Sequence, residues 1–276
     1  LGVCLEKRGD ELDVHKTISK GREIESIDSY NISNNIDENV AGIAAQAMLK
    51  NIDIDFGFKI IINKGIKPGS GIGSSAASSA GTVYAINQLL NSHFDNLDLV
   101  RFSMEGENFV SGSYHADNVA PIILGGITLV RSISDLDIIK LPSPKSLEVI
   151  IIRPNIEIKT SDSRRVVKKK VKIEKMVQQS ANLGAFISSL YSEDFDLMSR
   201  SVVDEIVEPD RSMLIPEFES IKKISTESGA LSCGISGSGP SVFALSNNSK
   251  TSKIIIDNIC SHLDNVSIDY DAFISK

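Results

Sequence analysis

The chain has 276 residues, of which 41% are hydrophobic and 24% are charged, a balance that predicts a globular protein long enough for two domains. The net charge of −7 argues against a nucleic-acid partner, because such a partner normally requires a basic surface. The sequence has no signal-peptide pattern and no apolar run near the roughly 20 residues of a membrane span, so we expect no membrane partner. Three widely spaced cysteines favour reduced thiols in the cytoplasm over a disulfide framework or a zinc site.

Runs of β-branched residues and the spacing of apolar residues predict a mixed α+β chain. In the N-terminal half we expect strands at 3–5, 56–62, 127–131 and 138–141, and helices at 40–49, 75–90 and 97–109. The first residues already have the texture of a strand interior, so we expect the chain to lack its natural first strand.

Two prolines, Pro142 and Pro144, interrupt both helix and sheet and mark the expected boundary between domains at 1–145 and 146–276. Beyond it we expect strands at 147–152, 230–235, 241–245 and 266–273, a mostly helical stretch at 162–190, and helices at 195–203, 216–228 and 250–263. This order predicts a two-layer α+β sandwich for the C-terminal half.

The most informative segment is a loop rich in glycine and serine that joins the strand at 56–62 to the helix at 75–90. Its glycines, Gly69, Gly71 and Gly73, allow positive φ angles and a close approach of the backbone to a ligand. The serines that follow lie where the first turn of a helix presents unpaired N–H groups and the positive end of its dipole. The loop therefore predicts an anion site, with phosphate as the expected anion.

Two better-known phosphate loops do not match this segment. A Walker loop ends in Gly-Lys-Ser or Gly-Lys-Thr, whereas Gly73 is followed by Ser74. A dinucleotide fingerprint needs Gly-x-Gly-x-x-Gly, and the spacing here is Gly-x-Gly-x-Gly.

A hydroxyl at the junction of loop and helix can ligate a Mg²⁺ ion that bridges nucleotide phosphates. Ser75 is our candidate for this role, although the adjacent Ser74 could exchange with it. Magnesium also calls for a carboxylate, and Glu107 is the candidate because its predicted helix leads directly into a polar segment at 113–121.

That polar segment places His115, Asp117 and Asn118 within four residues. A Ser-His-Asp hydrolase is the competing interpretation, but the sequence has no Gly-x-Ser-x-Gly elbow to supply the nucleophile.

The loop sequence Pro68-Gly69-Ser70-Gly71-Ile72-Gly73-Ser74-Ser75-Ala76 resembles the phosphate loop of the GHMP kinases, with isoleucine where the family has leucine. Glu107 and the segment Ser113-Tyr114-His115-Ala116-Asp117-Asn118-Val119-Ala120-Pro121 narrow the resemblance to homoserine kinases. The stretch Ser232-Cys233-Gly234-Ile235-Ser236-Gly237-Ser238-Gly239-Pro240-Ser241 is similar to the third motif of the GHMP kinases, a loop that braces the phosphate loop. Two arginines, Arg164 and Arg211, match family positions as well.

The resemblance implies a two-domain GHMP kinase fold, with a ribosomal S5 domain 2-like N-terminal domain and a ferredoxin-like C-terminal domain. It implies that Ser75 and Glu107 hold Mg²⁺. It also implies that homoserine is bound by His115, Asn118, Arg164 and Arg211, and that Asn118 and Arg211 act at the reacting groups. The nucleotide-binding residues that it implies are Asn39, Pro68, Gly69, Ser70, Gly71, Ile72, Gly73, Ser74, Ser75 and Ala76.

The activity that the resemblance implies is phosphorylation of L-homoserine by ATP, giving O-phospho-L-homoserine on the threonine pathway. The alternatives are another GHMP small-molecule kinase, or a catalytically silent nucleotide-binding homologue. The silent homologue is an alternative because the first motif of the family, which helps to bind homoserine, is absent from the sequence. The resemblance allows a homodimer without establishing one.

Overall fold

The computed structural model describes every residue except 7, 20, 27–29, 31, 157 and 159. By its internal contacts the chain divides into two compact units. The first unit is Leu1–Pro68 with Gly73–Lys140, and the second is Gly69–Ile72 with Leu141–Lys276. The predicted boundary after residue 145 lies near this division, but the predicted domains did not group four residues of the glycine loop with the C-terminal unit.

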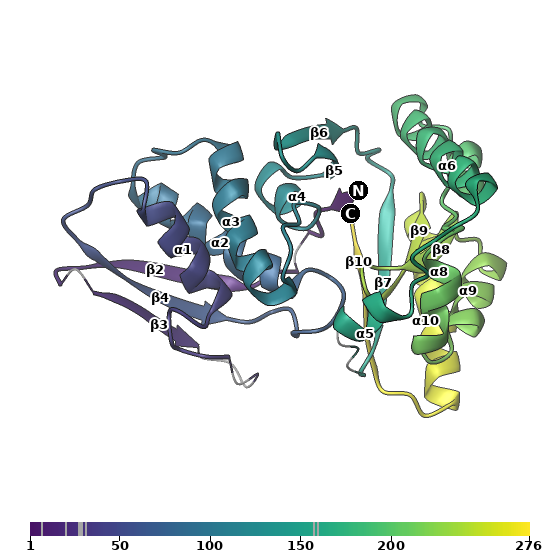
Figure 1. Cartoon of the computed structure of the whole chain (residues 1–276). Coiled ribbons are helices and arrows are strands. Elements are labelled where there is room, and N and C mark those ends of the chain that lie inside the picture. Colours follow the sequence, from purple (N-terminus) through teal and green to yellow (C-terminus); the bar gives the residue numbers. More distant parts are fainter. Residues whose placement is uncertain (7, 20, 27–29, 31, 157, 159) are drawn as a thin grey trace. The chain divides into compact units, whose positions relative to one another are not determined.

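The elements of the first unit are β1 (Gly2–Val3), β2 (Glu11–Thr17), β3 (Arg22–Ser26), α1 (Val40–Leu49), β4 (Gly57–Asn63), α2 (Ser74–Leu89), α3 (Asn96–Ser111), α4 (Val119–Leu124), β5 (Ile127–Ser132) and β6 (Asp137–Leu141). Strand β4 is the centre of a three-stranded sheet, antiparallel to β2 and parallel to β3. A second sheet has the order β1-β5-β6. Figure 1 shows α1, α2 and α3 packed beside one another, next to the sheet of β2, β4 and β3.

The core of the first unit follows from the side-chain period of β4. Phe58, Ile60 and Ile62 alternate along the strand and are each 1% exposed, because they face the helices. Helix α1 meets them with small residues such as Ala41 and Ala44, which let the helix lie close to its neighbours. This packing places the N-terminal end of α2 at the edge where β4 ends.

The sequence missed three elements of this unit. Strands β2 and β3 lie on the two edges of their sheet and carry many charged residues, so their apolar alternation is weak. Helix α4 contains Pro121, which argues against a helix in sequence-based reasoning but is tolerated in a first turn because its missing N–H would have no partner there. The predicted strands near β4, β5 and β6, and the predicted helices near α1, α2 and α3, are confirmed.

The elements of the second unit are β7 (Glu148–Pro154), α5 (Thr160–Arg165), α6 (Ile173–Ser192), α7 (Phe195–Ser201), α8 (Glu208–Arg211), the 3-10 turn η1 (Ser212–Leu214), α9 (Phe218–Glu227), β8 (Ser232–Ile235), β9 (Val242–Ser246), α10 (Ser249–Asn265) and β10 (Tyr270–Ser275). Its sheet is antiparallel throughout, in the order β10-β7-β9-β8. This is the strand order of a ferredoxin-like sandwich, so the expected α+β class and C-terminal fold are confirmed.

The helices of the second unit pack on this sheet through branched aliphatic side chains. Ile150 and Ile152 of β7 contact a cluster that includes Ile221 of α9 and Ile255 and Ile259 of α10, and all five are fully buried. The predicted helical stretch at 162–190 is two helices, α5 and α6, separated by the basic segment that follows Arg165. Within the described part of the chain, none of the helices is long and apolar enough to cross a membrane.

Candidate active site

The two serines at the start of α2 have different surroundings. The hydroxyl of Ser74 is buried and donates a hydrogen bond of 2.7 Å to the carbonyl oxygen of Ile66, so it closes the glycine loop on itself. Ser75 is partly exposed, and its hydroxyl lies close enough to the carboxylate of Glu107 to lower the pKa of that group. Of the two, Ser75 is therefore the one whose hydroxyl is placed to act with a carboxylate.

Glu107 is a buried carboxylate on α3, with only 6% of its surface exposed. It reaches the start of α2 because the preceding residue is Gly106, where a Cβ atom would lie 2.3 Å from the Ser79 hydroxyl and 2.7 Å from the Val40 carbonyl oxygen. Glycine at 106 thus lets α3 lie against both α1 and α2, and any larger residue would push Glu107 away from Ser75.

The electrostatic surroundings of Glu107 suit a cation. Burial raises the pKa of its carboxyl above the ordinary value, and the nearby Asp117 raises it further, while Ser75 and Lys64 lower it. Among the described residues, Oε1 of Glu107 has no hydrogen-bond partner. A buried carboxylate oxygen without a partner is costly, and a bound metal ion would remove that cost. The described residues contain no group of three or more metal-binding side chains, but Mg²⁺ takes one or two carboxylates and completes its shell with phosphate oxygens and water.

The polar segment 113–121 lies in the same unit. Asp117 and Asn118 are exposed. Asn118 immediately precedes α4, but its side chain does not cap that helix. Its Oδ1 would lie 3.7 Å from a Cβ atom built on Gly73, so the amide lies beside the residue that precedes α2. His115 is partly buried, and its Nε2 is 2.8 Å from the hydroxyl of Ser113.

In the second unit, the loop between β8 and β9 holds the glycine segment 69–72. The hydroxyl of Ser241 donates to the carbonyl oxygen of Ser70 at 2.6 Å, and the hydroxyl of Ser236 donates to that of Gly71 at 3.0 Å. Gly71 has φ +79° and lies so close to this loop that a Cβ atom would be 2.5 Å from the carbonyl oxygen of Gly239. The loop between β8 and β9 therefore braces the glycine segment 69–72, as the resemblance to the third motif implied, through backbone contacts and two serine hydroxyls.

The two arginines of the substrate prediction also belong to the second unit. Nη1 of Arg211 donates to the carbonyl oxygen of Gly237 at 2.9 Å, and its Nε donates to that of Ser163 at 3.2 Å. The hydroxyl of Ser163 donates to the carbonyl oxygen of Ser238 at 2.8 Å. Helix α5 and the loop between β8 and β9 are therefore connected both by this hydrogen bond and through Arg211. The side chain of Arg164 on α5 lies outside the described residues.

The remaining predicted nucleotide-binding residues have varied surroundings. Asn39 is 2% exposed and caps α1, since its Oδ1 accepts from the N–H of Ala41 at 2.9 Å and its Nδ2 donates to the carbonyl oxygen of Ser33 at 2.8 Å. Pro68 and Gly69 are exposed, Ile72 is partly exposed, and Ala76 is fully buried. Contact of Asn39 with the nucleotide stays a prediction, and both polar atoms of its amide are already used within the fold.

Comparisons with known proteins match both units. Residues 39–126 match the GHMP kinases N terminal domain, and residues 186–265 match the family described as GHMP kinases C terminal. The homoserine kinase of Methanococcus maripaludis strain C5 is 38% identical over 272 residues, which cover 98% of this chain and 88% of that protein. The chain belongs to the homoserine kinase family of GHMP kinases.

Other members agree with this assignment. The homoserine kinase of Chlorobaculum tepidum is 42% identical over 206 residues, but the match covers only 64% of that relative's length. A crystal structure of homoserine kinase from Cytophaga hutchinsonii has a TM-score of 0.96 and 40% identity, covering 99% of this chain and 88% of that one. The mevalonate kinase of L. major, at 15% identity and a TM-score of 0.74, shows only that the fold is shared.

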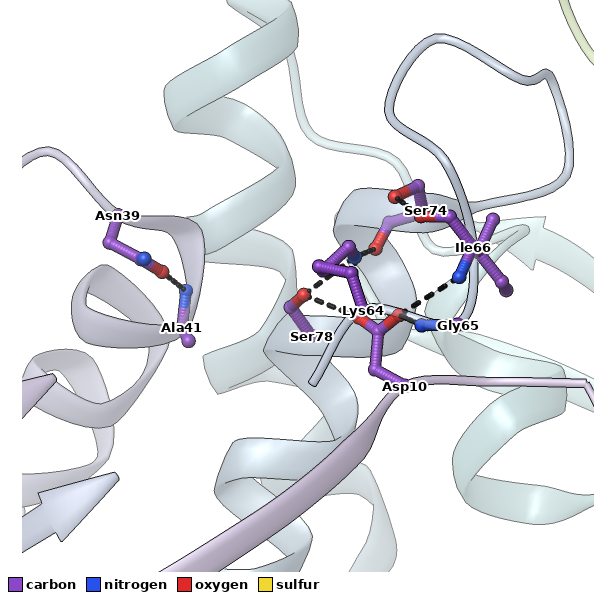
Figure 2. A network of polar contacts seen from close by, with 8 residues as sticks. All are labelled: Asp10, Asn39, Ala41, Lys64, Gly65, Ile66, Ser74 and Ser78. Carbon is purple, nitrogen blue, oxygen red and sulfur yellow. Dashed lines mark hydrogen bonds and ion pairs between the residues drawn. The ribbon is translucent and has the colours of Figure 1, made fainter. Parts of the chain in front are cut away.

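Sequence reasoning missed one polar cluster in this homoserine kinase family member. Asp10, Lys64 and Ser78 form a hydrogen-bonded network beneath the start of α2, and Figure 2 shows it together with Ser74 and Ile66. No motif marked these residues, because Asp10 and Lys64 are 54 positions apart in the chain. Asp10 immediately precedes β2 and Lys64 immediately follows β4, and neither strand has an unusual sequence. Only the pairing of β2 with β4 brings them together.

The close approach of Gly71 to Gly239 predicts an unusual sensitivity to a single methyl group. Gly71→Ala should destabilise the fold by more than the roughly 1–2 kcal/mol that a left-handed backbone costs a non-glycine residue, because the new Cβ also collides with a carbonyl oxygen. The control is Gly112→Ala, at φ +68° with nothing within 4 Å of its Cβ position, which carries the backbone strain without the collision. Urea unfolding of both variants measures the difference, and equal losses would show that the loop yields freely.

Proposed function

We propose that the protein transfers the γ-phosphoryl group of ATP to the hydroxyl of L-homoserine, forming O-phospho-L-homoserine and ADP. The observation that carries this proposal is the buried, unpartnered Oε1 of Glu107, on a carboxylate that meets Ser75 at the start of the helix following a glycine loop. The identity of the alcohol rests on membership of the homoserine kinase family.

The start of α2 supplies the phosphate-binding part of this proposal. Helix N-termini attract anions through free N–H groups and the helix dipole. Gly73 precedes the helix in the left-handed conformation, and as a glycine it has no side chain to cap these groups. Ser75 and Glu107 would hold Mg²⁺, which when bound neutralises charge on the phosphates and orients them for transfer. The residues themselves contribute a fixed hydroxyl and a carboxylate held away from bulk water.

We assign the amino-acid substrate to the four polar and charged residues that the family resemblance implies. His115 and Asn118 supply hydrogen-bonding groups, and Asn118 lies beside Gly73 at the start of α2. Arg211 and Arg164 in the second unit supply guanidinium groups, which bind a carboxylate in a fork that lysine cannot reproduce. Asn118 cannot act as a general base, and this is acceptable because phosphoryl transfer depends more on positioning and charge neutralisation than on early deprotonation.

The cellular location that we propose is the cytoplasm, because Cys4, Cys233 and Cys260 are all free thiols. The proposed product would enter threonine biosynthesis.

Substrate choice provides the first test. The full-length protein with ATP and Mg²⁺ should release ADP in the presence of L-homoserine and much more slowly with mevalonate or galactose. The reason is that two arginines paired with His115 and Asn118 suit a zwitterion, whereas mevalonate has a carboxylate without an ammonium group and galactose has neither. A coupled ADP-release assay across the three alcohols measures this. Preference for mevalonate or galactose would favour a different GHMP kinase activity, and release with none of them would favour a silent homologue.

The second test removes the charge of Glu107. Glu107→Gln should lower kcat by roughly 10²- to 10³-fold, the loss typical of one preorganised electrostatic partner. The melting temperature should stay equal or rise. The folded-state pKa of Glu107 is raised, so its ionisation opposes folding above the unfolded-state pKa, and the amide removes that opposition. Glu105→Gln on the same helix, where the carboxylate accepts only from the hydroxyl of Tyr114 among its described contacts, is the matched control. Near-normal turnover of Glu107→Gln would remove Glu107 from the metal site.

The third test concerns Arg211. Arg211→Ala removes a charge-assisted contact worth about 1.5–3 kcal/mol, so kcat/KM for homoserine should fall roughly 10- to 150-fold at 1.4 kcal/mol per tenfold. Arg211→Lys should rescue this loss only in part, because it keeps the charge but loses the fork. A rise confined to the KM for homoserine would indicate contact with the carboxylate alone, and a fall in kcat would indicate contact with the transferred phosphoryl group. Wild-type values for both substrates would exclude Arg211 from the site.

A further inference from the structure

The Asp10–Lys64 ion pair is deeply buried, and neither of its residues is assigned above to a ligand or to the metal ion. The two side chains are 0% and 2% exposed respectively, whereas the Lys59–Glu25 pair that starts on the same strand β4 has side chains 38% and 48% exposed. Exposed pairs of that kind contribute little to stability. A buried pair is different, because it must recover the cost of removing two charges from water through well-placed contacts.

The position of the pair follows from strand pairing. Glu11 of β2 lies opposite Asn63 at the end of β4, so Asp10 and Lys64 are the next residues beyond the end of this antiparallel ladder. The chain leaves the sheet at Lys64 and enters the glycine loop. The pair therefore lies at the point where a regular strand gives way to a segment with little conformational preference of its own.

Asp10 holds the beginning of that loop. Its Oδ1 accepts from the backbone N–H groups of Gly65 at 3.2 Å and Ile66 at 3.3 Å. Its Oδ2 contacts the ammonium of Lys64 and accepts from the hydroxyl of Ser78 at 2.6 Å. One carboxylate thus joins the loop entrance to the first turns of α2 (Figure 2).

Lys64 holds the end of the loop. Its ammonium donates to the carbonyl oxygen of Ser74 at 2.7 Å and to the hydroxyl of Ser78 at 2.9 Å. The hydroxyl of Ser74 in turn donates to the carbonyl oxygen of Ile66 at 2.7 Å. Ile66 and Ser74, which flank the glycine segment, are therefore connected both directly and through the ion pair.

We propose that the Asp10–Lys64 ion pair is a positioning device for the phosphate loop. By fixing Ile66 and Ser74 it sets the span of the loop and the place of the first N–H groups of α2, and it holds Ser75 in register with Glu107. The inference rests on the proposed function, because it takes the loop's ligand to be the phosphates of a nucleotide. Both residues act through the backbone of the loop and not as catalytic residues.

The sign of the effect at Asp10 distinguishes positioning from direct binding of phosphate by Lys64. If Lys64 bound the phosphates itself, removal of the negative charge at Asp10 would strengthen nucleotide binding or leave it unchanged. If the pair positions the loop, Asp10→Asn must weaken binding just as Lys64→Met does. The two partners act as a unit in that case, so their effects on binding should not add.

The experiment measures binding of ADP with Mg²⁺ to the full-length protein by isothermal titration calorimetry, with thermal unfolding of each variant alongside. Asp10→Asn and Lys64→Met should each raise the Kd roughly 10- to 100-fold, the range found when residues that orient a binding group are lost. The double variant should bind ADP no more weakly than whichever single variant has the higher Kd. Lys59→Met, which breaks the exposed pair on the same strand, should bind as the wild type does.

Several outcomes would overturn the inference. If both folded single variants keep the wild-type Kd, the pair is purely structural. If Lys64→Met weakens binding while Asp10→Asn leaves it unchanged or tightens it, Lys64 is a phosphate ligand. If a single variant does not fold, two other variants can be compared with the wild type for their Kd for ADP. The double variant buries no unpaired charge, and Ser78→Ala removes one neutral hydrogen-bonding group from the network. Wild-type binding of ADP without phosphorylation of homoserine would overturn the proposed function alone, whereas no binding of ADP by the wild type would overturn both.

Discussion

The structure depends on holding a glycine-rich loop in one shape. Glycines such as Gly69, Gly71 and Gly73 give the backbone access to ligands, but they also make the loop's conformational entropy large. The fold limits that freedom by hydrogen bonds to the loop's own carbonyl oxygens and N–H groups. In the second unit, Ser236 and Ser241 bond the glycine segment, and in the first unit Asp10 and Lys64 bond its two flanks. The side chains that make these bonds are ordinary serines and one ion pair, so the loop's shape is imposed from outside it.

The carboxylate at Glu107 shows a local conflict between stability and the proposed function. Burial disfavours its ionised form, and Oε1 has no partner among the described residues. A fold selected only for stability would place an amide or an apolar residue here. The surrounding residues instead bring the charge closer to the start of α2, with Gly106 permitting the close packing and Lys64 lowering the electrostatic cost. Such a conflict is expected where a site is arranged for a charged ligand.

Several residues that the family resemblance marks as ligand-binding also have structural contacts. Asn39 caps α1 with its amide oxygen and bonds Ser33 with its amide nitrogen. Arg211 bonds two carbonyl oxygens, one on α5 and one on the loop between β8 and β9. Substitution at either position will therefore change the local fold as well as any ligand contact, and this is why the kinetic split between KM and kcat is more informative for Arg211 than a loss of activity.

The sequence by itself determined the α+β class, most of the long helices and central strands, and the position of the glycine loop, for which it predicts an anion as ligand. These features depend on residues close together in the chain, such as the alternation along β4 or the run of small residues at the start of α2. It could not separate Ser74 from Ser75, because adjacent hydroxyls look alike until a neighbouring helix and loop supply their partners. It also gave no sign of Asp10 and Lys64, since each is unremarkable among its sequence neighbours and acquires its contacts only through the pairing of β2 with β4. Contacts between distant parts of the chain decided these points, because hydrogen-bond partners and burial are properties of the packed fold and not of local sequence.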